Sequence, residues 1–262
     1  MPRFKLTIEY EGTRYSGWQI QKNARTVQGE IAEALRTVLK TDSFEFLGSG
    51  RTDAGVHALG QVAHLEAPTV LAPHILRMKI NDALPPDINI LDVRTAPPRF
   101  HARHNAFARS YLYQICRRRT AFGKRFVWWV KEDLDTASMR TAAELFTGMQ
   151  DLRSFTDDDP EKKSTRVLLE EIKLKEAGDL ILVRVVGSHF LWKSVRRIVG
   201  VLVEAGKGKL GETDIRGLLK THSSTPAGLT APPSGLFLET VYYEENPASS
   251  PIHPVVAVNH ER

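Results

Sequence analysis

The sequence of 262 residues predicts an α+β fold with a mainly antiparallel sheet. Strand-like and helix-like segments do not alternate strictly, and several of the expected strands are neighbours in the chain. A doubly wound parallel sheet needs a crossover, usually a helix, between successive strands, so this order argues against one. With 42% hydrophobic residues, the chain is long enough to bury a substantial core and to form two structural units.

In the first part of the chain, residues 4–10 alternate apolar and polar side chains, which predicts a half-buried strand. Thr26 is a typical helix N-cap, and apolar residues follow it at helical spacing (Val27, Ile31, Leu35 and Leu39). Strands are expected at 60–67 and 88–94, with a helix around residues 75–80 between them.

The second part repeats this mixture of elements. Strands are predicted at 107–116, 165–175, 179–186 and 236–243, and helices at 135–147, 190–205 and 212–220.

Two halves are expected, one at 1–104 and one at 105–245, with the boundary near 104–106. The sequence has no low-complexity linker there, so the halves are expected to pack closely around a cleft. Residues 246–262 carry Pro, Ser and Ala without periodicity and are expected to form a loose tail.

The distribution of charge along the chain indicates a polyanionic partner more strongly than the net charge of +5 does. Between Arg99 and Arg125 there are eight Lys or Arg residues and no acid, with Phe and Tyr interleaved. A solvated basic face is the simpler interpretation of such a run. The interleaved aromatic residues favour a nucleic-acid groove instead.

Cysteine usage and hydropathy bear on the compartment. Cys116 is the only cysteine, so an intramolecular disulfide is impossible, and a small buried residue on a strand is expected. A charged-then-apolar leader and a long apolar run are both missing from the sequence. A soluble cytoplasmic protein is therefore expected.

The most informative segment is GRTDAGVHA at residues 50–58. It predicts a turn that displays the Asp53 carboxylate two residues from the Arg51 cation, with glycines nearby. An ionised carboxylate so placed suits a nucleophile or a general base. The alternative is a structural turn in which Asp53 bonds to its own backbone.

Two segments resemble a metal site and a phosphate loop, but neither has the residues that such a site requires. His101 and His104 stand three residues apart without an acid or a Cys to complete a metal site. The segment from Gly200 to Lys207 has five residues between its glycines, Gly208 follows the lysine, and the pattern is that of an amphipathic helix. Neither a metal nor a cofactor is expected.

The order of residues in GRTDAGVHA closely resembles the signature of the tRNA pseudouridine synthase A family. Further colinear segments are similar to motifs of that family from about residue 4 to about residue 243: YEGTRYSGWQ at 10–19, TVQ at 26–28, NDALP at 81–85, FHAR at 100–103, RSYLY at 109–113, VRRIVG at 195–200 and PSGL at 233–236. This extent makes chance a poor explanation.

Three features depart from the family pattern. Glu11 replaces the usual Asp, Gln150-Asp151-Leu152 stands where the family has H-D-F, and Asp157, Asp158 and Asp159 form an acidic run. The last two lie outside the catalytic motifs, so they bear on substrate range more than on reaction type.

The resemblance implies a pseudouridine synthase fold, two related α/β-sandwich halves around a central cleft. It also implies that Asp53 is the catalytic residue and that Arg51, Tyr111, Arg196 and Leu236 contact the substrate. Asp53 would either attack ribose C1′ or remove the C2′ proton, and the sequence leaves both routes open. Tyr111 would stack on the flipped uracil, whereas Tyr113, on the same side of the strand, is expected to pack in the core.

The implied substrate is tRNA, modified in the anticodon stem-loop at positions 38, 39 and 40 by a homodimer without a cofactor. RNA contacts are expected from seven basic residues (Arg103, Arg109, Arg117, Arg118, Arg119, Lys193 and Arg197). The alternatives are a related synthase with other RNA targets and an RNA-binding or chaperone module that has lost catalysis. Intact Asp53, Tyr111 and Arg196 argue against the module.

Overall fold

The computed structural model describes residues 1–159, 161–162, 164–245 and 250–258. The chain divides into two compact units. Unit 1 is Met1–Phe107 with Phe237–Asn246, and unit 2 is Ala108–Leu236 with Pro247–Arg262. Both units combine helices with a mostly antiparallel sheet, which confirms the predicted α+β class.

Unit 1 is built on strands in the order β4-β1-β3-β10. Their bounds are β1 (Arg3–Tyr10), β3 (His57–Glu66), β4 (Ile88–Thr95) and β10 (Leu236–Tyr242), and β2 (Glu45–Gly48) pairs with β3. Pairing is antiparallel except between β3 and β10, where Phe237 lies opposite His57.

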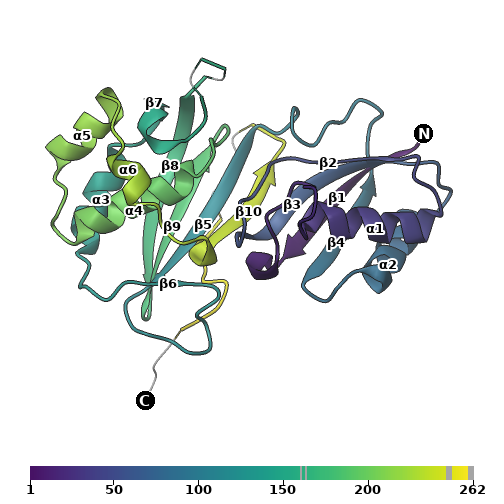
Figure 1. Cartoon of the computed structure of the whole chain (residues 1–262), viewed down its shortest axis with the longest axis horizontal. Helices are drawn as coiled ribbons and strands as arrows, with labels where there is room; N and C mark the ends of the chain where they lie inside the picture. The colour runs from purple at the N-terminus through teal and green to yellow at the C-terminus, as the bar shows by residue number, and fades with distance from the viewer. Residues whose placement is uncertain (160, 163, 246–249, 259–262) are drawn as a thin grey trace. The chain divides into compact units, whose positions relative to one another are not determined.

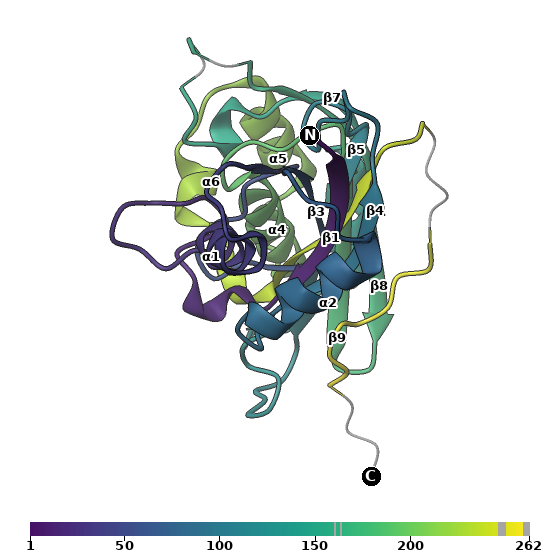
Figure 2. The same cartoon turned by 90° about the vertical axis from the view of Figure 1, so that its right-hand side faces the viewer.

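Two helices cover one face of this sheet, α1 (Val27–Leu39) and α2 (Pro73–Ala83) (Figures 1 and 2). Every second side chain of β1 is buried, as the alternation of residues 4–10 predicts. The Thr26 hydroxyl accepts a hydrogen bond from the Gly29 N–H at 3.2 Å, which confirms the expected helix cap. A one-turn 3₁₀ helix, η1 (Gly12–Arg14), follows β1.

Unit 2 has the strand order β5-β9-β8-β7. These strands are β5 (Ala108–Cys116), β9 (Leu180–Gly187), β8 (Arg166–Ala177) and β7 (Gly148–Asp151), and β6 (Trp128–Trp129) pairs with β5. The helices are α3 (Thr136–Glu144), α4 (Ser194–Gly206), α5 (Glu212–Lys220) and α6 (Thr225–Gly228), with the 3₁₀ turns η2 (Arg153–Phe155) and η3 (Pro233–Gly235).

Helix α4 forms the centre of the helical layer of unit 2. Its Gly200 lies so close to Leu229 that an added Cβ would be 1.7 Å from the Leu229 carbonyl oxygen. Residues 200–206 are helical and Lys207 is the helix C-cap, so this segment is not a phosphate loop. Cys116 is fully buried at the end of β5, as predicted.

Residues 250–258 differ from the expectation of a loose tail. This segment runs over the face of the unit 2 sheet opposite the helices (Figure 2). The buried Arg184 guanidinium donates to the Ser250 carbonyl at 2.5 Å, and Ile252 and Val258 join an apolar cluster on β5 and β9. Burial of these two side chains explains why a segment without periodicity is ordered.

The division of the chain differs from the expected one in the place of β10, most of which belongs to unit 1 because it pairs with β3. In the described ranges, no helix has the length and apolar character needed to cross a membrane.

Candidate active site

The loop between β2 and β3 carries Asp53. The Val56 N–H donates to the Asp53 carbonyl at 3.2 Å, and Gly55 takes a φ of 78°, so the chain turns tightly just after the carboxylate. Arg51 is exposed, whereas Asp53 is half-buried. The turn therefore exposes the Arg51 side chain to solvent and shields Asp53 in part.

The opening motif of the chain braces this loop. The Trp18 N–H donates to the Thr52 carbonyl at 3.1 Å, and the Gly55 N–H donates to the Tyr15 carbonyl at 3.3 Å. The Tyr10 and Thr52 hydroxyls share a hydrogen bond of 2.8 Å. Both sides of Asp53 are thus tied to residues 10–18.

Two glycines of the opening motif allow this close approach. A Cβ on Gly12 would lie 1.9 Å from the Val56 carbonyl oxygen, and one on Gly17 would lie 2.6 Å from the Thr52 carbonyl oxygen. Gly17 also has a φ of 93°, which favours glycine. The Gly12 N–H donates to His57 Nδ1 at 3.0 Å, so the buried His57 closes the loop at its other end.

Tyr15 links the loop to the start of β4. Its hydroxyl donates to the Asp87 carboxylate at 2.5 Å, and burial together with this bond raises the pKa of the Tyr15 phenol well above its usual value. The Arg25 guanidinium lies 4.8 Å from the Tyr15 ring centroid. Tyr15 stays protonated and supports the loop rather than titrating.

The TVQ motif anchors the start of α1 to the same region. The Gln28 N–H donates to the Trp18 carbonyl at 2.9 Å, and the Gln28 side chain donates to the Phe46 carbonyl at 3.0 Å. The motifs at residues 10–19, 26–28 and 50–58 therefore form one packed assembly in unit 1.

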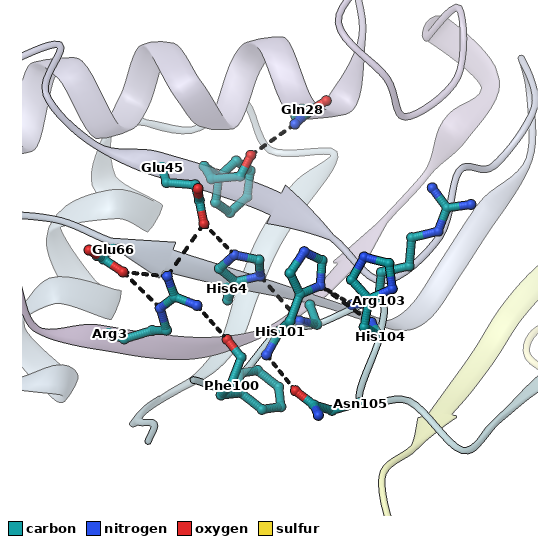
Figure 3. A network of polar contacts seen from close by, with 12 residues as sticks. Arg3, Gln28, Glu45, His64, Glu66, Phe100, His101, Arg103, His104 and Asn105 are labelled. Carbon is teal, nitrogen blue, oxygen red and sulfur yellow. Dashed lines mark hydrogen bonds and ion pairs between the residues drawn. The ribbon is translucent and has the colours of Figure 1, made fainter. Parts of the chain in front are cut away.

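The FHAR segment is held by a polar network, which Figure 3 shows. His64 is fully buried and lies between Glu45, 2.8 Å from its Nε2, and the Ala102 N–H, which donates to Nδ1 at 3.1 Å. The Arg103 N–H donates to His101 Nδ1 at 3.1 Å. Burial, reinforced by the neighbouring histidines, lowers the pKa of His101, so the ring stays neutral and accepts this bond.

In unit 2, β5 carries the two tyrosines of the RSYLY motif. Tyr111 is 9% exposed, and its ring meets Phe190 edge to face with centroids 5.0 Å apart. Tyr113 is fully buried and donates to the Pro232 carbonyl at 2.8 Å. A Cβ on Gly235 would lie 2.6 Å from the Tyr113 ring, so the PSGL turn packs on it. The prediction that Tyr113 is a core residue is confirmed.

Arg196 is fixed rather than freely solvated. Its Nε donates to the Ala231 carbonyl at 2.7 Å, and the Ala231 N–H donates back to the Arg196 carbonyl at 3.1 Å. The side chain is half-buried on α4. Leu236, at the start of β10, is 5% exposed.

The basic residues differ among themselves. Arg117 pairs with Glu176 and Arg118 with Asp179, each at 2.5 Å, so part of the acid-free run is neutralised by acids distant in sequence. Arg197 is 3% exposed and pairs with Asp157. The expectation that Arg197 contacts RNA is corrected, because its buried charge is already compensated within the protein.

The acidic run at residues 157–159 finds its partners nearby. Asp157 also pairs with Lys193 at 3.0 Å, and Asp158 accepts the Trp192 N–H at 3.2 Å. Asp159 pairs with Lys162 at 3.1 Å. Asp157 and Asp158 therefore hold the chain just before α4.

With this geometry in place, comparison with known proteins decides the family. Residues 6–105 and 142–244 match a family model described as tRNA pseudouridine synthase. The chain belongs to this family. The predicted resemblance is confirmed over most of the sequence.

Named relatives agree with the family model. The tRNA pseudouridine synthase A of Rhodopseudomonas palustris (strain BisA53) is 39% identical over 247 residues, which cover 93% of this chain and 100% of that protein. The enzyme of the same name from Agrobacterium fabrum (strain C58 / ATCC 33970) is 38% identical, with 94% of each chain covered. That of Geobacillus kaustophilus (strain HTA426) is 39% identical, with 93% and 95% covered.

The synthase is therefore an isomerase that makes pseudouridine in tRNA. The residues that hold the Asp53 loop, above all Tyr15, His57 and Asp87, were not predicted from the sequence. Tyr15 and His57 lie inside the motifs at residues 10–19 and 50–58, and Asp87 had no signal because its role depends on a contact across 72 residues. In the described part of the chain, no cluster of His, Cys, Asp and Glu suited to a metal ion is found.

Proposed function

We propose that the synthase isomerises uridine in the anticodon stem-loop, at positions 38, 39 and 40, with Asp53 as the catalytic carboxylate. The observation that carries the proposal is the GRTDAGVHA loop, in which the backbone on both sides of Asp53 is hydrogen-bonded to the opening motif. A reacting group held in this way keeps its orientation, which is what catalysis by positioning requires.

The reaction breaks the bond from ribose C1′ to uracil N1, turns the base and joins C1′ to C5. C5 then loses its proton and N1 takes one up. Every atom of the uridine is retained except for exchange of that proton, so the balance needs no cofactor. Asp53 either forms a bond to C1′ or removes the C2′ proton to give a glycal. Both routes require the ionised carboxylate.

Four side chains are proposed to serve the same uridine. Arg51 is exposed beside Asp53, which suits insertion into the space that a flipped base leaves. Tyr111 is proposed to stack on the uracil and to move the C5 proton, and Leu236 to line the same pocket. Arg196 is proposed to pair with Asp53 or with a phosphate, supported by its fixed guanidinium.

Phosphate contacts are proposed for Arg103, Arg109, Arg119 and Lys193, and also for Arg117 and Arg118, whose acid partners leave them partly exposed. The synthase is further proposed to be a cytoplasmic homodimer. Light scattering of the purified protein tests the dimer, which a mass of one chain would contradict.

Mapping pseudouridine in total tRNA from cells with and without the gene tests the target. We expect loss at positions 38, 39 and 40, restored by the wild-type gene and not by the Asp53→Asn gene. Loss at other uridines would make the protein a synthase with other targets. Unchanged pseudouridine at every site would contradict the enzymatic proposal.

A further inference from the structure

The segment between β9 and α4 exposes a tryptophan in unit 2. The Trp192 side chain is 50% exposed, and the Trp192 backbone N–H donates to the Asp158 carboxylate at 3.2 Å. Just before it, Leu191 is buried and its carbonyl accepts the Ser194 hydroxyl at 2.9 Å. A large aromatic side chain is thus held at the surface by an ordered backbone.

Lys193, the N-cap residue of α4, has a backbone conformation that is rare at helix N-caps. Its φ of 62° and ψ of 1° are left-handed, whereas residues at a helix N-cap are usually extended. Left-handed non-glycine residues store strain and are common at functional sites. Here the conformation is accompanied by an ion pair between Lys193 Nζ and Asp157 at 3.0 Å.

The same ammonium group lies against the tryptophan. Lys193 Nζ is 4.2 Å from the Trp192 ring centroid, within cation–π range. One face of the indole is therefore covered by a cation. A planar ligand that binds Trp192 must approach the other face or the exposed edge.

The charges beside Trp192 are organised around Asp157. Asp157 is shared between Lys193 and the buried Arg197, so one carboxylate compensates two cations. Asp157 accepts hydrogen bonds from Arg197, which has the larger effect, and from Lys193. These bonds lower the pKa of Asp157, which keeps the carboxylate charged near neutral pH. The acidic run therefore orders this corner, where the Asp157 and Asp158 carboxylates together balance the charges of Lys193 and Arg197.

The segment is continuous with residues proposed to serve the substrate. Phe190, two residues before Trp192, meets the Tyr111 ring edge to face with centroids 5.0 Å apart. Arg196 follows Trp192 by four residues, about one helical turn into α4. A base held at Trp192 would belong to the same RNA as the uridine.

We propose that Trp192 is a stacking platform for an unpaired nucleobase of the tRNA, with Lys193 holding the ring and contacting the adjoining phosphate. This subsite depends on the tRNA substrate of the family and not on the choice of positions 38 to 40. Bases of any identity stack on an exposed aromatic ring, and an adjacent cation adds affinity for the backbone. The subsite would therefore raise affinity without reading sequence.

The first test measures the affinity for total tRNA of the wild type, of Trp192→Ala and Trp192→Phe, and of the control variant Trp129→Ala. Trp129, on β6, is similarly exposed at 42%. Loss of stacking should weaken binding by about 5- to 150-fold in Trp192→Ala. Trp192→Phe should retain most of the affinity, and Trp129→Ala should bind like the wild type. Equal affinity of Trp192→Ala and wild type would overturn the proposal.

Fluorescence separates stacking from a structural role. Saturating tRNA should quench the emission of the wild type and of Trp129→Phe, and the quenching should be largely lost in Trp192→Phe. Weak binding by folded Trp192→Ala together with full quenching in Trp192→Phe would overturn stacking. Because total tRNA is the ligand, failure of the anticodon assignment would leave both results unchanged.

Discussion

Replacing Gly12 by alanine tests how closely the opening motif holds the Asp53 loop. The new Cβ would lie 1.9 Å from the Val56 carbonyl oxygen, whereas such contacts are essentially never shorter than 3.0 Å. The two backbones must therefore separate by at least 1.1 Å. That shift strains the bond from the Gly12 N–H to His57 and moves the turn that carries Asp53.

The expected cost has two parts. Overpacking of this kind destabilises a protein by about 1–3 kcal/mol, seen as a lower denaturation midpoint. A displacement of about 1 Å at a reacting group lowers turnover by about 10²-fold, measured under single-turnover conditions with saturating enzyme.

Gly217→Ala is the matched control, because no neighbouring atom lies within 4 Å of its Cβ position in the exposed middle of α5. It should raise stability by about 0.5–1 kcal/mol and leave turnover unchanged. A folded Gly12→Ala protein with the turnover of the wild type would refute the proposed bracing of Asp53.

Three further predictions concern unit 2. Tyr111→Phe should lose about 10²- to 10⁴-fold in turnover if the hydroxyl moves the proton, whereas only Tyr111→Leu should be severely impaired if the ring acts by stacking; full turnover in both would leave Tyr111 without a role in catalysis. Hydrogen bonds, of which the one from Arg117 has the largest effect, lower the pKa of Glu176 from 4.5 to about 2. The stabilising contribution of Glu176 is therefore present above pH 4.5 and is lost as the pH falls toward 2. Denaturant titrations should show a shallower loss of stability over this range in Glu176→Gln, and an unchanged slope would contradict the linkage. Neutralising Arg117, Arg118 and Arg119 together should flatten the salt dependence of tRNA binding by about one unit of log–log slope for each phosphate that is no longer bound, and an unchanged slope would remove these arginines from the RNA path.

Local sequence signals predicted most of the fold. Thr26 caps α1 and the alternation of residues 4–10 forms β1, because both features depend on neighbours within a few positions. The short strands β2, β6 and β7 were not predicted, since segments of two to four residues carry too little periodicity. Residues 250–258 were misjudged because their burial depends on side chains of β5 and β9.

The candidate site shows the same limit. Motif resemblance gives Asp53, Tyr111 and Arg196 as candidates, and their roles stay predictions, whereas the charge pattern misjudged Arg197. Its partner Asp157 lies 40 residues away, and neither residue shows in the sequence that it is compensated by the other. Contacts between distant segments, unlike helix periods and caps, leave no signal within a short window of sequence.

The Asp53→Asn variant tests directly whether Asp53 is the catalytic carboxylate. The change keeps the shape of the side chain and removes the ionised oxygen, and the measurement is tritium release from C5-labelled uridine in tRNA. We expect loss of tritium release with tRNA affinity retained. Release within about tenfold of the wild type, about 1.4 kcal/mol of barrier, would contradict Asp53 as the catalytic carboxylate.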